Sequence, residues 1–258
     1  MASILFEKIE GVAKIALNRP EVFNSFNREM ALALQNCLDE CAQDDQIRAI
    51  YLTGTGKAFC AGQDLQEVVS PDGPTLTTIL QEHYNPIISR IRSIEKPFVC
   101  AVNGVAAGAG ANIALACDIT VAKESASFIQ AFSKIGLIPD SGGTFFLPRL
   151  IGLQKATALM MLGEKVTAPE AEKMGMIYKT FPDGNFEQES FALAQILAQM
   201  PTKGLGLTKR ALNQSLFNDL KTQLEVEDKL QTEAGTTHDY KEGVAAFLEK
   251  RKPAFRGN

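Results

Sequence analysis

The pattern of apolar and polar positions predicts alternating strands and helices in the first two thirds of the chain. Residues 4–9 and 12–17 alternate apolar and polar side chains around Glu10-Gly11, which is typical of a β-hairpin. Residues 28–43 then carry apolar side chains at helical spacing, and Asn27 is in place to cap that helix. Further strands are expected at 47–53, 97–102 and 119–122, and residues 57–65 are interpreted as a short strand and turn. This alternation indicates an α/β core.

Helical patterns continue to the C-terminus. Residues 75–94 form one such pattern, and Pro86 inside it predicts a kink. Residues 104–117 are interpreted as a loop that enters a helix. No internal repeat of 20–50 residues is visible, and only helices are expected after Gly142. Their predicted ranges are 144–150, 154–162, 168–174, 186–200, 208–218, 220–232 and 240–250.

Composition and charge favour a soluble enzyme or binding domain. The 258 residues are 45% hydrophobic and 22% charged, with 26 Lys and Arg against 30 Asp and Glu. A net charge of −4 without a basic stripe argues against a nucleic-acid partner. The first residues lack the pattern of a signal peptide, and the long uncharged run at 101–117 is broken by glycines, so we expect no membrane span and a cytoplasmic protein. The 5 cysteines are expected to be reduced core thiols, and no zinc-like spacing predicts a metal site.

Two glycine-containing turns are candidates for binding chemistry. Residues 58–65 (AFCAGQDL) and 102–112 (VNGVAAGAGAN) each follow a predicted strand and lead into a helix. Small residues let a ligand approach the backbone, and free N–H groups at a helix start could stabilise an oxyanion. Taken singly, either segment is explained as well by close packing of a helix on a strand.

Together with a third segment, these turns resemble the crotonase (enoyl-CoA hydratase/isomerase) family. The third segment is 136–144 (GLIPDSGGT), continued by LPRLIG at 147–152, and the match runs from the opening hairpin to residues 255–257. The resemblance implies a spiral core of ββα turns over residues 1–200. It also implies a helical region over residues 201–258 that builds a homotrimer or a dimer of trimers.

The resemblance also implies an acyl-CoA thioester as substrate, with no separate cofactor because coenzyme A is part of that substrate. The thioester oxygen would accept hydrogen bonds from the backbone N–H groups of Gln63 and Ala109. The remaining residues implied to contact the substrate are Lys57, Ala58, Ala61, Gly62, Asp64, Leu65, Tyr84, Gly108 and Phe132.

The chain departs from the hydratases of this family at the positions of their two catalytic glutamates. Asn112 and Phe132 stand there, and the nearest acid in a matching motif is Asp140. One base in an apolar pocket suits moving a proton within a substrate better than adding water. Segments 106–112 and 138–143 are similar to those of isomerases that convert ring 1,2-epoxyphenylacetyl-CoA to oxepin-CoA and shift Δ3/Δ2 double bonds. We therefore expect an acyl-CoA isomerase with Asp140 as its acid/base group.

Several alternatives stay open. The activity could be that of a fatty-acid Δ3,Δ2-enoyl-CoA isomerase or an enoyl-CoA hydratase. A non-catalytic acyl-CoA-binding or RNA-binding relative belongs to another class. Asp140 could instead only cap a helix, and Asp64 is expected to be such a cap. His83 is interpreted as a partly exposed surface residue rather than a second acid/base group, and Tyr84 as pocket or core.

Overall fold

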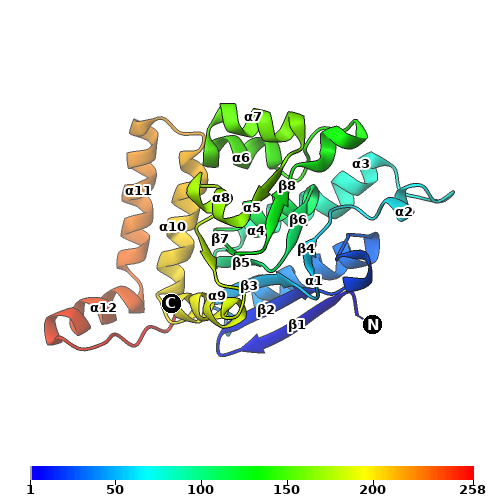
Figure 1. Cartoon of the computed structure of the whole chain (residues 1–258). Coiled ribbons are helices and arrows are strands. Elements are labelled where there is room, and N and C mark those ends of the chain that lie inside the picture. The colour runs from blue at the N-terminus through cyan, green and yellow to red at the C-terminus, as the bar shows by residue number, and fades with distance from the viewer. Residues whose placement is uncertain (1) are drawn as a thin grey trace.

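In the computed structural model, which describes residues 2–258, the strands form two mixed sheets (Figure 1). Neighbouring strands are parallel except in the β1–β2 hairpin and the β8–β9 pair. The larger sheet has the order β1 (Ile4–Ile9), β2 (Val12–Leu17), β3 (Ala49–Gly54), β5 (Phe98–Val102), β7 (Ile119–Lys123), β10 (Lys179–Phe181). The smaller sheet has the order β4 (Ala58–Cys60), β6 (Val105–Ala107), β8 (Ser127–Ile129), β9 (Lys165–Thr167).

The chain winds through these sheets in repeated ββα turns. Strand β3 of the larger sheet is followed by β4 of the smaller sheet and then by helices, and the pairs β5–β6 and β7–β8 repeat this course. The spiral implied by the resemblance is therefore confirmed. The helices are α1 (Arg28–Gln43), α2 (Leu65–Val68), α3 (Leu76–Thr78), α4 (Asn85–Ser93), α5 (Ala109–Ala116), α6 (Gly143–Ile151), α7 (Leu153–Leu162), α8 (Ala168–Lys173), α9 (Phe186–Ala198), α10 (Thr202–Ser215), α11 (Leu220–Gly235) and α12 (His238–Glu249), with short turns η1 (Pro20–Val22), η2 (Ile79–Tyr84) and η3 (Ala131–Ile135).

Local sequence signals explain why the first elements match their predicted bounds. Glu10 and Gly11 both have positive φ, 49° and 82°, which is the backbone of a tight hairpin turn. Asn27 Oδ1 accepts a hydrogen bond from Met30 N at 3.0 Å and so fixes the start of α1.

The expectation that only helices follow Gly142 is wrong, because β9 and β10 lie there. Like β6 and β8, they are three residues long, too short for an alternating pattern to show. Helix α10 begins at Thr202 rather than at residue 208. Gly206 in its first turns has a packing role, since an ideal Cβ on it would lie 2.4 Å from the carbonyl oxygen of Glu95.

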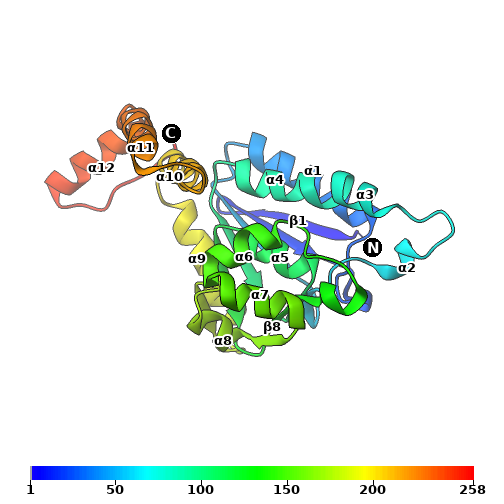
Figure 2. The ribbon, with the colours of Figure 1, turned by 90° about the horizontal axis from the view of Figure 1, so that it is seen from above.

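Both faces of the larger sheet are buried at its central strand β5. In β5, Phe98, Cys100 and Val102 pack into the core cluster shared with α1, α4 and α5, whereas Val99 and Ala101 face the cluster shared with α9. This alternation follows from the two-residue period of a strand. Figure 2 shows α1 and α4 along one side of the molecule, with α5, α6 and α7 beside them.

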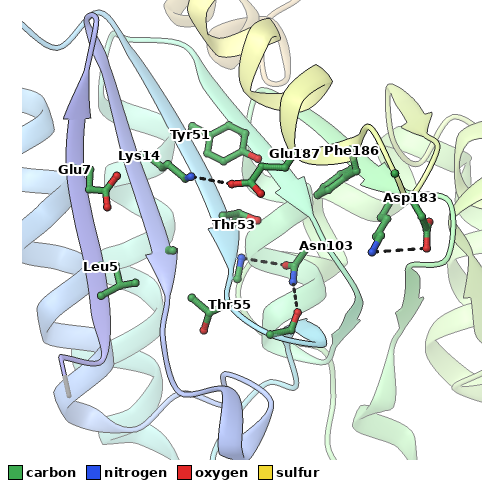
Figure 3. A pocket seen from close by; sticks show the side chains of 15 residues that line it. Leu5, Glu7, Lys14, Tyr51, Thr53, Thr55, Asn103, Asp183, Phe186 and Glu187 are labelled. Atoms are coloured by element: carbon green, nitrogen blue, oxygen red, sulfur yellow. Dashed lines mark hydrogen bonds and ion pairs between the residues drawn. The ribbon is translucent and has the colours of Figure 1, made fainter.

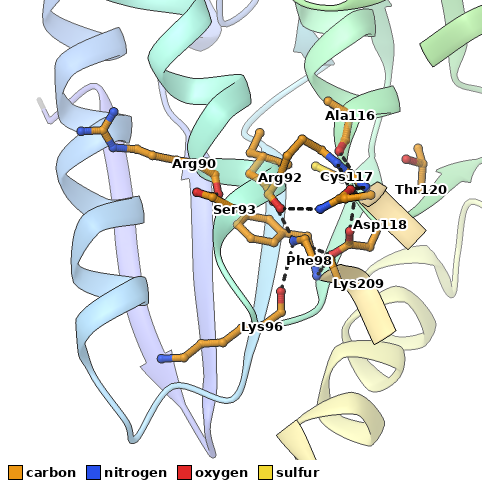
Figure 4. A network of polar contacts seen from close by, with 12 residues as sticks. Arg90, Arg92, Ser93, Lys96, Phe98, Ala116, Cys117, Asp118, Thr120 and Lys209 are labelled. Atoms are coloured by element: carbon orange, nitrogen blue, oxygen red, sulfur yellow. Dashed lines mark hydrogen bonds and ion pairs between the residues drawn. The ribbon is translucent and has the colours of Figure 1, made fainter. Parts of the chain in front are cut away.

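Helices α10, α11 and α12 extend away from the two sheets (Figures 1 and 2). A polar network around the buried Lys209 and the partly exposed Asp118 anchors α10 to the core (Figure 4). Lys209 Nζ of α10 lies 2.8 Å from Asp118 Oδ2 and donates to the carbonyl oxygen of Ile91 at 2.6 Å. Asp118 also accepts from Arg92 Nη1 at 3.2 Å and from Phe98 N at 2.9 Å. Burial lowers the pKa of Lys209, and Asp118 partly offsets that effect.

All five cysteines are free thiols, and each except the half-buried Cys37 is buried. No helix within residues 2–258 is long and apolar enough to cross a membrane. The same described residues hold no group of three or more His, Cys, Asp or Glu side chains placed to bind a metal ion.

Candidate active site

The smaller sheet brings the two glycine-containing turns together. Strands β4 and β6 pair in parallel, with Cys60 opposite Ala106. Gly62, with φ 96°, follows β4, and an ideal Cβ on it would lie 3.1 Å from Ala107 O and 3.6 Å from Ala109 N. The close approach requires glycine at this position. It sets the backbone of Gln63 beside the first residue of α5.

Two backbone N–H groups at this junction are available to a ligand. Ala109 is the first residue of α5, so its N–H has no acceptor within the helix. The residues flanking Gln63 bond to the backbone of Phe26, through Gly62 O at 2.7 Å and Asp64 N at 2.8 Å. Backbone N–H groups of successive residues in a bridge point in opposite directions, so the Gln63 N–H points away from Phe26. It has no backbone acceptor among residues 2–258. Such a pair of donors can stabilise an oxyanion.

Asp140 lies in a tight turn before α6. Ser141 and Gly142 both have positive φ, 50° and 74°. The capping position of α6 is Gly142, which makes no side-chain cap, so the interpretation of Asp140 as a helix cap is wrong. The half-buried carboxylate accepts from Ser141 Oγ at 2.8 Å, and burial raises the pKa of Asp140 above its usual value. A carboxyl group of this kind is suited to exchange protons.

Tyr84 connects the segment η2 to the first glycine-containing turn. Its ring is fully buried and packs edge-to-face on Phe26, with 5.7 Å between the ring centroids. Its hydroxyl donates to Gln63 Oε1 at 3.0 Å. The other end of the Gln63 amide donates to Glu67 Oε2 at 2.8 Å. Burial raises the pKa of Tyr84, and the negative charge of Asp140 adds to the shift. The expectation of a buried Tyr84 is confirmed.

The positions of the two hydratase glutamates carry no charge in this chain. Phe132 is buried, and its Cζ would lie 3.8 Å from an ideal Cβ on Gly108, the residue before Ala109. Its ring therefore forms an apolar wall next to one of the two N–H donors. Asn112, one turn further along α5, is fully buried. Its amide accepts from Gln130 Nε2 at 2.8 Å and donates to Asp140 O at 2.8 Å.

The other residues predicted to contact the substrate include several in and beside the first glycine-containing turn. Lys57, Ala61 and Leu65 are exposed, whereas Ala58 is buried and its carbonyl oxygen accepts from Asn24 Nδ2 at 2.9 Å. Asp64 caps α2 by accepting from Gln66 N at 3.1 Å, as expected, and also pairs with Arg19 at 2.9 Å.

The interpretation of His83 as a partly exposed residue is wrong. His83 is fully buried, and neither ring nitrogen has a hydrogen-bond partner among the described residues. It lies in η2, a π-helical segment just before Pro86, where the wider turn changes which side chains face inward. A helical period of 3.6 residues cannot anticipate that change.

Sequence reasoning missed Gln130 and its hydrogen bond to Asn112. One signal was present: Asn112 is the single polar residue in α5, and a buried amide requires partners. A separate cavity of about 540 Å³ lies along β1, β2 and β3 (Figure 3). Four of its charged residues form two pairs, Lys14 with Glu187 at 3.1 Å and Lys123 with Asp183 at 3.7 Å. None of the predicted site residues lines it.

Comparisons with known proteins agree with this architecture. The model of the enoyl-CoA hydratase/isomerase family matches residues 7–258. The chain is 48% identical over 260 residues to the 1,2-epoxyphenylacetyl-CoA isomerase of Escherichia coli, covering 100% of this chain and 99% of that protein. It is 46% identical over 255 residues to a "probable enoyl-CoA hydratase" of Rhodobacter capsulatus, covering 99% and 98%. The crystal structure of enoyl-CoA hydratase from Bacillus anthracis superposes with a TM-score of 0.93 at 33% identity, covering 99% and 100%. The chain therefore belongs to the enoyl-CoA hydratase/isomerase family, and its fold is the crotonase fold.

Proposed function

We propose that this protein is an acyl-CoA isomerase in which Asp140 moves a proton from one carbon of the substrate to another. The observation that carries the proposal is the half-buried carboxylate of Asp140, which caps no helix and has a raised pKa. The two positions that hold glutamates in hydratases are Asn112 and Phe132, so neither can help activate a water molecule. A single base beside an apolar wall favours isomerisation.

The proposed reaction uses backbone donors and one side chain. The thioester oxygen accepts hydrogen bonds from Gln63 N–H and Ala109 N–H, which stabilise the enolate formed when the adjacent carbon loses a proton. Asp140 accepts that proton and returns it farther along the acyl chain. Its raised pKa suits both steps, because the acid and base forms of the group then differ less in free energy near neutral pH.

The substrate that we propose is ring 1,2-epoxyphenylacetyl-CoA, with Δ3-enoyl-CoA thioesters as further substrates. The support is the 48% identity over the full chain to the E. coli isomerase of that name. The aromatic ring of Phe132 beside Gly108 provides an apolar surface for an aryl or alkyl group. With the epoxide, Asp140 would assist ring opening by the same proton transfer.

Hydration is the second candidate, favoured by the 46% identity to the R. capsulatus protein. The test is turnover of three substrates by the same preparation: epoxyphenylacetyl-CoA, 3-hexenoyl-CoA and crotonyl-CoA, followed by mass and ultraviolet spectra. We expect hydration of crotonyl-CoA to be far slower than isomerisation of 3-hexenoyl-CoA. A hydration rate equal to or above the isomerisation rate would refute the isomerase assignment.

We also propose that the C-terminal helices assemble the chain into a homotrimer or a dimer of trimers, as the family resemblance implies. Large apolar side chains on these helices, and in the turn between α10 and α11, are exposed in the single chain, which supports an unoccupied interface. They include Leu212, Phe217, Leu224, Phe247 and Leu248. Sedimentation velocity tests the proposal, and a monomer at micromolar concentration would overturn it.

A further inference from the structure

We propose that Asn112 is a positioning residue that, together with Gln130, fixes the turn carrying Asp140. This inference rests on the proposed function, because it assigns the role of proton carrier to Asp140. It goes further in giving a role to the amide that replaces a hydratase glutamate.

The Asn112 side chain joins three separate segments. It belongs to α5, accepts from Gln130 Nε2 just after β8, and donates to the carbonyl oxygen of Asp140, with both distances 2.8 Å. The side chain is fully buried, so water does not compete for these hydrogen bonds. The same helix begins at Ala109, whose N–H is one of the two proposed oxyanion donors. A single amide thus connects the helix of that donor to the backbone of the proposed base.

The chemistry of an amide fits this position, whereas a carboxylate does not. A carbonyl oxygen such as that of Asp140 can only accept, so the group facing it must donate. The Nδ2 of Asn112 meets that need, and its Oδ1 is then left to accept from Gln130. An ionised glutamate or aspartate has acceptors only, and it would face the Asp140 carbonyl oxygen without a proton to share.

The Asp140 turn needs such support because its backbone is strained. Ser141 is a non-glycine residue at φ 50°, a conformation that persists only when the surroundings hold it. The backbone packs tightly on the amide, since an ideal Cβ on Gly143 would lie 2.3 Å from Asn112 Nδ2. Asp140 O accepts from Gly143 N, at 2.8 Å, as well as from Asn112. The carbonyl oxygen is therefore held by two donors, which fixes the direction of the carboxylate on the same residue.

The position of the Gln130 side chain in this arrangement has an energetic cost. Its Oε1 is buried and has no partner among the described residues, while its Nε2 is committed to Asn112. An unsatisfied buried acceptor costs about 1–3 kcal/mol. We infer that the orientation of Asn112, which this hydrogen bond fixes, offsets that cost.

The test compares Asn112→Leu, Asn112→Asp and Gln130→Leu with the wild type. In Asn112→Leu we expect kcat for 3-hexenoyl-CoA to fall by about 10²-fold, the effect of a misplacement near 1 Å, with little change in KM. In Asn112→Asp the added negative charge raises the pKa of Asp140, so the acidic limb of the kcat profile should move to higher pH. Gln130→Leu should lower kcat less, because the contact between Asn112 and Asp140 O survives.

Hydrogen–deuterium exchange gives a second readout that does not depend on turnover. Loss of the amide should speed exchange in residues 141–146 and leave α10 unchanged. The matched control is Asn213→Leu, which removes an amide of α10 that donates to Arg92 O at 2.9 Å. It should leave exchange near Asp140 and kcat at wild-type values.

The outcomes separate the two proposals. A wild type that isomerises none of the substrates refutes the proposed function, while exchange at 141–146 still tests the positioning role. Wild-type exchange in Asn112→Leu overturns that role, whether or not kcat falls. If Asn112→Leu fails to fold, Gln130→Leu decides, since wild-type exchange at 141–146 together with wild-type kcat in that variant contradicts the proposal.

Discussion

Replacing Lys209 by Met tests how strongly the polar network around it holds α10 on the core. Methionine keeps the apolar stem that passes the Phe98 ring, where Nζ lies 4.5 Å from the ring centroid. It removes the charge and three contacts: Asp118 at 2.8 Å, Ile91 O at 2.6 Å and Lys96 O at 3.4 Å. Ile91 O lies in the last turn of α4, so that helix also loses a partner for one of its terminal carbonyl groups.

The expected loss in the free energy of unfolding depends on the contacts that Asp118 keeps. Breaking a buried ion pair usually costs 3–5 kcal/mol, because one charge is left without a partner. In Lys209→Met, Asp118 keeps Arg92 and Phe98 N, so we expect the lower end, about 3 kcal/mol. In Asp118→Asn, two buried or half-buried cations lose their shared anion, and we expect a loss of about 5 kcal/mol.

Urea unfolding at pH 7, followed by circular dichroism, measures both losses as changes in the free energy of unfolding. Lys203→Met is the matched control on the same helix. Lys203 is half-exposed and pairs with Glu233 at 2.6 Å, so its loss should cost no more than about 1 kcal/mol. A Lys209→Met variant no less stable than the control, or an Asp118→Asn variant less affected than Lys209→Met, would refute the reasoning.

Four further outcomes are expected at the proposed site. Asp140→Asn should reduce isomerisation about 10²–10⁴-fold while leaving binding of a CoA thioester intact, as measured by steady-state kinetics and calorimetry. Because burial raises the pKa of Asp140 above its unfolded value, ionisation destabilises the fold increasingly as the pH rises from the unfolded toward the folded pKa, and fully above the folded pKa. Asp140→Asn should therefore show a higher Tm at pH 7, with a gain that shrinks as the pH falls through the folded pKa. A CoA thioether, which lacks the carbonyl oxygen, should bind more weakly than the thioester by about 1–3 kcal/mol if Gln63 N–H and Ala109 N–H donate to that oxygen; equal Kd values would contradict the oxyanion site. Phe132→Glu should raise hydration of crotonyl-CoA relative to isomerisation and lower stability by burying a carboxylate; an unchanged ratio of the two rates would show that this wall does not control the reaction.

The sequence predicted elements well where a local signal marks each end. The bounds of the hairpin and of α1 were correct because Glu10, Gly11 and Asn27 act on their immediate neighbours. Strands β6, β8, β9 and β10 were missed because three residues cannot display a period. The burial of His83 depends on a π-helical segment, and the role of Gln130 depends on a contact 18 positions away along the chain. Such features arise from tertiary packing, which no local pattern encodes.

The pairing of β4 with β6 has a consequence for how this pocket can be redesigned. The two proposed donors are main-chain groups that lie just beyond these paired strands, Gln63 after β4 and Ala109 at the start of α5 after β6, so the strand pairing sets where they lie relative to each other. Glycine permits the close approach of α5 to β4: an ideal Cβ on Gly110 would lie 2.5 Å from Cys60 O. In the proposed mechanism, backbone geometry therefore specifies binding of the carbonyl group, and side chains at 112, 132 and 140 specify proton movement. A library varied at those three positions, with the glycines kept, could therefore explore new reactions without rebuilding the carbonyl-binding half of the pocket.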